Sequence, residues 1–124
     1  MRLPRKSVTQ KHSRLTANGR YVWFTERLWR LAENLPVKTV GIESIAEFDL
    51  NCWFGADKPP TCRAVAAHAR RIYEADLSYP IILSAEGFLM DGGHRLAKAW
   101  LLDLKEIQAV QFEIDPEPDR VIAE

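Results

Sequence analysis

The run Asp91-Gly92-Gly93-His94-Arg95 holds the residue types best suited to chemistry in this sequence. It follows a short apolar run and precedes a segment with helical spacing, so we expect it to join a strand to a helix. The first amides of a helix have no partner within the helix, and Gly92 and Gly93 lack the Cβ that would keep a ligand away from them. The helix dipole and the guanidinium of Arg95 favour negative charge, and His94 can donate a hydrogen bond or move a proton near neutral pH. The run therefore predicts a binding site for a phosphate group.

A structural interpretation of the same run is open at this point. Asp91 can act as the N-cap of the helix, the two glycines can form a tight turn, and His94 and Arg95 can lie in solvent. Two glycines before a helix are a weak motif, so the pattern alone does not choose between a phosphate site and a capped turn.

The elements that position this turn are predicted from the spacing of apolar residues. Helical spacing indicates three helices, over residues 25–35, 61–75 and 94–104. Alternation, or short apolar runs around a glycine turn, indicates strands over residues 37–45, 81–83, 88–90 and 107–114. Thr61 is the expected N-cap of the second helix, whose buried stripe is expected to be Val65, Ala69, Ile72 and Tyr73. This order of elements predicts an α+β fold with a small mixed β-sheet flanked by helices.

The length of 124 residues favours one domain, which we place at residues 20–114. Residues 1–19 are basic and lack a steady period, so we expect a flexible arm, and residues 115–124 are expected to form an acidic tail. The two termini have opposite charges, so they can attract each other or another molecule. The arm is a candidate for non-specific nucleic-acid binding by phosphate neutralisation, with a solvated tail as the alternative.

No apolar stretch approaches the length of a membrane span and no signal peptide is recognised, so we expect a cytoplasmic protein without membrane contact. Cys52 and Cys62 match no paired metal-ligand spacing and are expected to be reduced thiols. Trp53 and Phe54 fall in the longest internal loop, where they serve as a lid, as a contact with a partner, or as a contact of the loop with the core. His68 is expected to be a hydrogen-bonded, semi-buried side chain, and His12 falls in the arm.

Residues 79–99, with the sequence YPIILSAEGFLMDGGHRLAKA, resemble the core of the ParB/sulfiredoxin superfamily. In that family a hairpin leads into a Gly-x-His/Arg-Arg turn at the N-terminus of a helix, and the looser likeness extends from about Val37 to Ile114. The resemblance implies the same α+β fold. It also implies that Gly92, Gly93, His94 and Arg95 bind nucleotide phosphates.

Three departures limit what this resemblance implies. Gly93 stands where sulfiredoxins have their reactive cysteine, so we do not expect thiol-phosphoryl repair chemistry. The chain continues for only some ten residues past its last predicted strand, so we do not expect the helix-turn-helix of partition-type ParB proteins. No second CTP-binding motif rich in Glu, Asn and Arg follows Leu104. The turn is most similar to the Asp-Gly-His-His-Arg turn of ParB-like free-serine kinases, with Gly93 in place of the first His.

The resulting expectation is a nucleotide-phosphate-binding protein, with ATP, ADP and CTP not distinguished. If it is a phosphotransferase or nucleotide hydrolase, it needs a carboxylate to orient a metal ion such as Mg²⁺ or to accept a hydroxyl proton. The candidates are Asp91 beside the turn and Glu47, with Asp49, in the loop after the first strand. One alternative is a non-enzymatic nucleotide- or nucleic-acid-binding module of ParB type, and another is a purely structural partner protein. Turnover, acceptor and oligomeric state are left open by the sequence.

Overall fold

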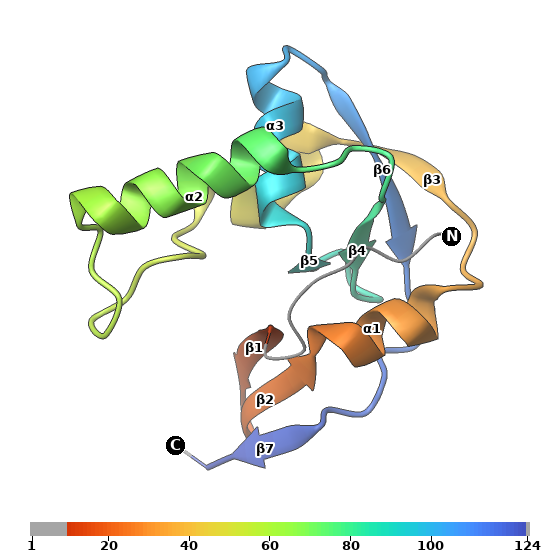
Figure 1. Cartoon of the computed structure of the whole chain (residues 1–124). Coiled ribbons are helices and arrows are strands. Elements are labelled where there is room, and N and C mark those ends of the chain that lie inside the picture. The colour runs from red at the N-terminus through yellow and green to blue at the C-terminus, as the bar shows by residue number, and fades with distance from the viewer. Residues whose placement is uncertain (1–9, 124) are drawn as a thin grey trace.

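The computed structural model describes residues 10–123, and their architecture is α+β, as predicted (Figure 1). The described helices are α1 (Thr25–Ala32), α2 (Cys62–Glu74) and α3 (Gly93–Leu101), with two short 3-10 turns, η1 (Ile42–Ser44) and η2 (Ala46–Asp49). The described strands are β1 (Lys11–Thr16), β2 (Gly19–Phe24), β3 (Lys38–Gly41), β4 (Ile81–Leu83), β5 (Leu89–Asp91), β6 (Glu106–Gln111) and β7 (Arg120–Ile122). The predicted hairpin of two short apolar strands is confirmed as β4 and β5, which end directly at the glycine turn.

The central sheet has the strand order β3-β6-β4-β5, with β4 parallel to β6 and the other pairs antiparallel. Its side chains alternate between two apolar clusters, because successive residues of a strand point to opposite faces. Ile81 and Leu83 lie in the cluster with Leu96 of α3, while Ile82 lies in the cluster with Leu28 of α1. The mixed sheet is therefore covered by α3 on one face and α1 on the other, and the turn before α3 is fixed to a fully buried strand.

A second sheet, β1-β2-β7, is formed by the two ends of the described chain. The prediction of a flexible basic arm is wrong for Lys11–Thr16, which pair in register with β2, while residues 1–9 lie outside the described part. Alternation was hidden because the inward positions of β1 include the polar residues His12 and Arg14. The predicted acidic tail is likewise wrong for Arg120–Ile122, which pair with β2 as β7.

The opposite charges of the two ends meet in this second sheet. Arg14 forms an ion pair with Asp115 at 3.3 Å and Arg27 forms one with Asp119 at 3.5 Å. Asp119 also accepts a hydrogen bond from the backbone amide of Phe24 at 2.8 Å. The expected attraction between the two ends of the chain thus takes the form of ion pairs within the protein.

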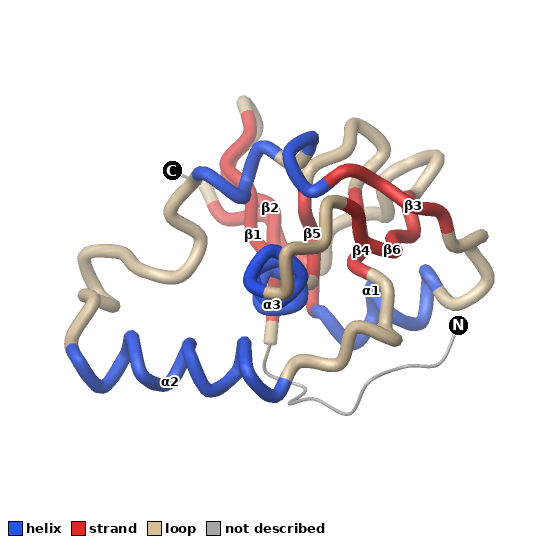
Figure 2. Tube along the Cα trace, turned by 90° about the horizontal axis from the view of Figure 1, so that it is seen from above, coloured by secondary structure: helices blue, strands red, loops and turns tan. Residues whose placement is uncertain are grey.

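Helix α2 lies at the side of the molecule, with α3 between it and the strands (Figure 2). Thr61 is its N-cap, as predicted, and accepts a hydrogen bond from the amide of Ala64 at 3.1 Å. The predicted buried stripe is wrong, because no residue of α2 is buried and Val65 and Tyr73 are 49% and 82% exposed. The half-buried residues of α2 are Ala64, His68 and Ile72. The face of α2 that contacts the protein is centred on a histidine, so the positions of its apolar residues did not predict it.

Among the helices of the described residues, none combines the length and the apolar character that a membrane crossing requires.

Candidate functional site

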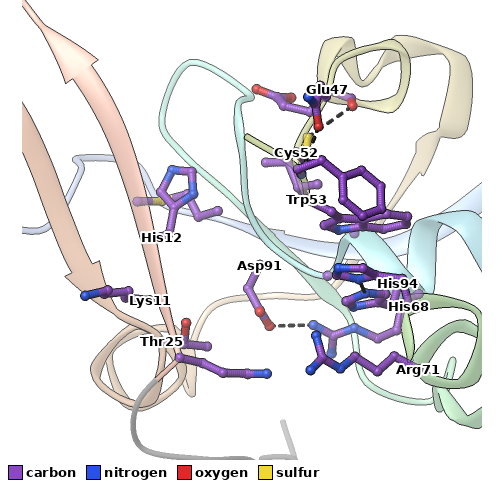
Figure 3. Close-up of a pocket in the computed structure, with 18 of the residues that line it drawn as sticks. Lys11, His12, Thr25, Glu47, Cys52, Trp53, His68, Arg71, Asp91 and His94 are labelled. Carbon is purple, nitrogen blue, oxygen red and sulfur yellow. Dashed lines mark hydrogen bonds and ion pairs between the residues drawn. The ribbon is translucent and has the colours of Figure 1, made fainter. Parts of the chain in front are cut away.

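A broad cleft of about 1580 Å³ lies beside the turn before α3 (Figure 3). Residues of β1, including Lys11 and His12, form one wall of the cleft. The loop before α2 and α2 itself form the other wall, and Asp91 of β5 lies between the two walls. The cleft thus brings together segments that are far apart in the sequence, and it includes all five residues of the predicted phosphate turn.

The turn is built around Gly92, the N-cap residue of α3, which has φ +116°. A Cβ at this position would lie 2.5 Å from Cγ2 of Ile81, so both the backbone conformation and the packing require glycine. No side chain caps the helix here, and the first intrahelical bond runs from the amide of Leu96 to the carbonyl of Gly92 at 2.9 Å. The helix therefore begins, without a side-chain cap, at the cleft, as an anion site requires.

Asp91 and Arg95 differ from their expected roles. They form an ion pair of 2.5 Å, with side chains only 12% and 5% exposed, and Asp91 also accepts a hydrogen bond from the indole of Trp29 at 2.9 Å. The i,i+4 spacing lets the carboxylate before the helix reach a guanidinium of its first turn. Arg95 is therefore held by an acid inside the protein instead of being presented to a ligand, and Asp91 is occupied as its counter-ion.

His94 takes part in a ring assembly that the sequence did not predict. Nδ1 of His68 and Nε2 of His94 are 2.8 Å apart, so one imidazole donates a hydrogen bond to the other. The ring of Trp53 lies parallel to both imidazoles, with centroid distances of 4.8 Å to His68 and 4.6 Å to His94. Phe54 meets His68 edge-on at 5.3 Å. We call Trp53, His68 and His94 the ring stack.

The ring stack fixes the loop before α2 to the start of α3. A Cβ on Gly93 would lie 3.3 Å from Nε1 of Trp53, so the missing side chain leaves room for the indole. The interpretation of His68 as a semi-buried, hydrogen-bonded side chain is confirmed, and its partner is a site residue. Trp53 was expected to serve as a lid, as a partner contact or as a contact with the core, and the structure shows it in contact with the first turn of α3 and with α2.

Charge around the stack is mainly positive on the α2 side. Burial, followed by the nearby Arg71 and Lys58, lowers the pKa of His68. Both cations are exposed and line the cleft. On the acidic side, burial and Glu47 together raise the pKa of the Cys52 thiol, so this cysteine is not an activated nucleophile.

Glu47 lies in η2 and lines the cleft, whereas Asp49 is exposed and does not line it. Oε1 of Glu47 is buried and has no hydrogen-bond partner. Two further buried side-chain atoms of the described residues share this property, Nε2 of His12 and Nε of Arg95. All three residues line the same cleft. Buried polar atoms are normally paired, so this concentration of unpaired atoms is typical of a binding site.

Sequence reasoning missed His12, whose strand was interpreted as an arm. Within residues 10–123, no group of three or more His, Cys, Asp or Glu side chains is arranged to hold a metal ion. A role for Mg²⁺ stays a hypothesis.

No family model and no curated protein matches the chain. Among solved structures, the chain is similar to a Pnob8-like ParB-N domain, with 21% sequence identity and a TM-score of 0.41. The match covers 66% of this chain and 31% of the other, so the chain spans less than a third of that protein's length. Nucleotide binding and a relation to sulfiredoxins or kinases stay predictions.

Proposed function

We propose that the cleft binds a nucleotide through its phosphate groups at the N-terminus of α3. The observation that carries this proposal is the start of α3 at Gly93 without a side-chain cap, inside a cleft lined by the exposed cations Lys58 and Arg71. Backbone amides of the first turn of α3, beginning with that of Gly93, would donate to phosphate oxygens, assisted by the helix dipole. Arg71 and Lys58 would supply the positive charge at the phosphate that the sequence analysis expected from Arg95.

Two other contacts support this arrangement. The Asp91–Arg95 ion pair carries no net charge, so it holds the turn without repelling an anion. Trp53 stacks on His68 and His94 and lies at the edge of the proposed phosphate site. Aromatic faces of this kind also suit a nucleobase, because any base can stack on them.

The test is thermal denaturation with ATP, ADP, CTP and GTP, each with and without Mg²⁺. A ligand that binds only the folded protein raises its melting temperature. Arg71→Ala is expected to weaken binding by about five- to tenfold, as loss of one charge-assisted contact does. Arg70→Ala is the matched control, because Arg70 is a neighbouring exposed arginine of α2 that does not line the cleft. Equal affinities of the two variants, or no shift with any nucleotide, would contradict the proposal.

A version with turnover depends on Glu47, because Asp91 already has two partners and Glu47 Oε1 has none. In that version Glu47 would orient Mg²⁺ or accept a proton from the attacking hydroxyl. Release of phosphate or nucleoside diphosphate from nucleotide with Mg²⁺ should then occur and be lost in Glu47→Gln. Binding without product release would leave a non-enzymatic nucleotide-binding module.

The alternative of nucleic-acid binding through the N-terminal basic residues is tested separately. Arg14 and Arg27 are already paired with acids, which weakens this alternative for the described residues. Salt-sensitive retention on DNA or RNA that is unaffected by Arg71→Ala would favour it over the nucleotide site.

A further inference from the structure

His12 lies on the wall of the cleft that the proposed phosphate site does not use. It is the register partner of Trp23 across β1 and β2, and the two rings stack with centroids 5.7 Å apart. Figure 3 shows it across the cleft from His68 and His94. Its Nε2 is buried and has no hydrogen-bond partner in the protein. The imidazole thus lines the cleft and carries one polar atom that no group of the protein satisfies.

The charged groups around His12 are already paired with each other. Arg14 on its own strand is bound to Asp115, which follows β6, and Asp91 of β5 is bound to Arg95. The neighbour on β2, Trp23, is uncharged. A protonated His12 would therefore have no counter-ion of its own. Burial, followed by Arg14, lowers the pKa of His12 to about 4, with Asp91 and Asp115 acting in the opposite direction. The imidazole is neutral at pH 7 when the cleft is empty.

An anion in the cleft would change this balance. It would bring negative charge close to Nε2 and accept a hydrogen bond from the protonated ring, and both effects favour the imidazolium. Nε2 of His12 is thus suited to an oxygen of such a ligand.

We infer that His12 contacts the bound ligand and that the cleft takes up a proton at His12 when it binds a phosphate-bearing or similar oxyanionic group. This inference rests on the proposed function. It adds a binding residue from the opposite wall and predicts that anion affinity increases as the pH falls.

Sulfate is a suitable probe, because it resembles phosphate and does not itself titrate between pH 5 and 8. Its binding should be measured by isothermal titration calorimetry from pH 5.5 to 7.5, in pairs of buffers with different heats of ionisation. Between the pKa values of His12 in the free and bound states, affinity is expected to rise up to about tenfold for each unit that the pH falls. The buffer dependence of the heat gives the number of protons taken up.

His12→Gln keeps a neutral polar side chain but removes this titration. The variant should lose the contribution of His12 to the pH dependence of binding and to the proton uptake, while any contribution of other groups in the cleft remains. Leu15→Gln is the matched control, because Leu15 lies on the same strand, is 59% exposed and does not line the cleft. Nuclear magnetic resonance of the His12 ring in the wild-type protein should show its pKa rising when sulfate is added, which does not depend on the variant folding.

The outcomes separate the two proposals. If sulfate binds with the same pH dependence and proton uptake in wild type and His12→Gln, or if the His12 resonance does not shift, the inference is wrong and the phosphate site stands. If neither sulfate nor any nucleotide binds the wild-type protein at any pH, the proposed function is wrong.

Discussion

The two walls of the cleft are built differently. The β1 wall belongs to a three-stranded sheet, in which Trp23 is 1% exposed. An ion pair connects this sheet to the C-terminal segment. The opposite wall contains α2, in which no residue is buried, and a loop held to the body of the protein by the ring stack. Segments with few buried apolar contacts open most easily. The cleft therefore combines a fixed wall with one that is suited to movement during ligand binding.

The largest expected effect is at Asp91, between the walls. Asp91→Asn leaves the Arg95 guanidinium, 5% exposed, without its counter-ion. Loss of one partner of a buried ion pair costs about 3–5 kcal/mol of unfolding free energy. Urea denaturation measures this loss, and a second variant, Asp91→Leu with Arg95→Met, should recover much of it. If Asp91→Asn is as stable as wild type, the pair does not hold the turn.

The pH dependence of stability tests the fixed wall. The pKa of His12 is about 4 in the folded protein and 6.5 in the unfolded chain, so the unfolded chain binds more protons between these values. The contribution of neutral His12 is complete above pH 6.5 and is lost as the pH falls toward 4. Over that pH window the unfolding free energy of the wild-type protein should fall by on the order of 1–2 kcal/mol more than that of His12→Gln, after allowance for solvent screening. Denaturation curves of the two proteins from pH 4 to 7 provide the comparison, and parallel curves would show that His12 is not held neutral.

A smaller effect on stability is expected at the movable wall. Trp53→Ala removes two ring contacts of a half-buried side chain, so the unfolding free energy should fall by about 1 kcal/mol. Hydrogen exchange and proteolysis over residues 50–60 should nevertheless increase strongly, because the loop loses its contact with α3. Trp100→Ala is the control, since Trp100 is 52% exposed and lies outside the cleft. Equal exchange in both variants would mean that the ring stack does not hold the loop.

The smallest effect is expected on the outer face of α2. Tyr73→Ser changes a side chain that is 82% exposed, so the unfolding free energy should change by about 0.5 kcal/mol or less. A larger loss in thermal or urea denaturation would show that α2 is held more firmly than its exposure indicates, and the contrast between the walls would weaken.

The central part of the fold was predictable because its residues follow simple periods. Ile81, Ile82 and Leu83 form a short apolar run before a glycine turn, and the apolar residues of α3 recur at helical spacing. Thr61 was identifiable because an N-cap is a local interaction. The α+β class followed from the order of these elements.

The second sheet and the ring stack were not predicted. The pairing of β1 with β2 is local but was hidden by the polar residues of β1, whereas β7 and the ring stack depend on partners distant in the sequence. His12 and Arg14 occupy inward positions of β1, where they contact Trp23 and Asp115. Because both residues are polar, the sequence of β1 does not alternate between apolar and polar residues. His68 belongs to the site because α2 places its side chain beside His94, which the sequence alone does not show. Arg95 was expected at a ligand because the sequence does not show whether the neighbouring acid reaches it.

Gly92 joins the cleft to the interior of the protein. One added methyl group would strike Ile81, which has no exposed surface, so the shape of the turn cannot be altered without disturbing the central sheet. Substitutions at this residue should therefore first appear as poorly folded protein, and weaker ligand binding would be a secondary result. A change of ligand preference is more readily obtained at the exposed Arg71 and Lys58, which can vary without any cost to the core.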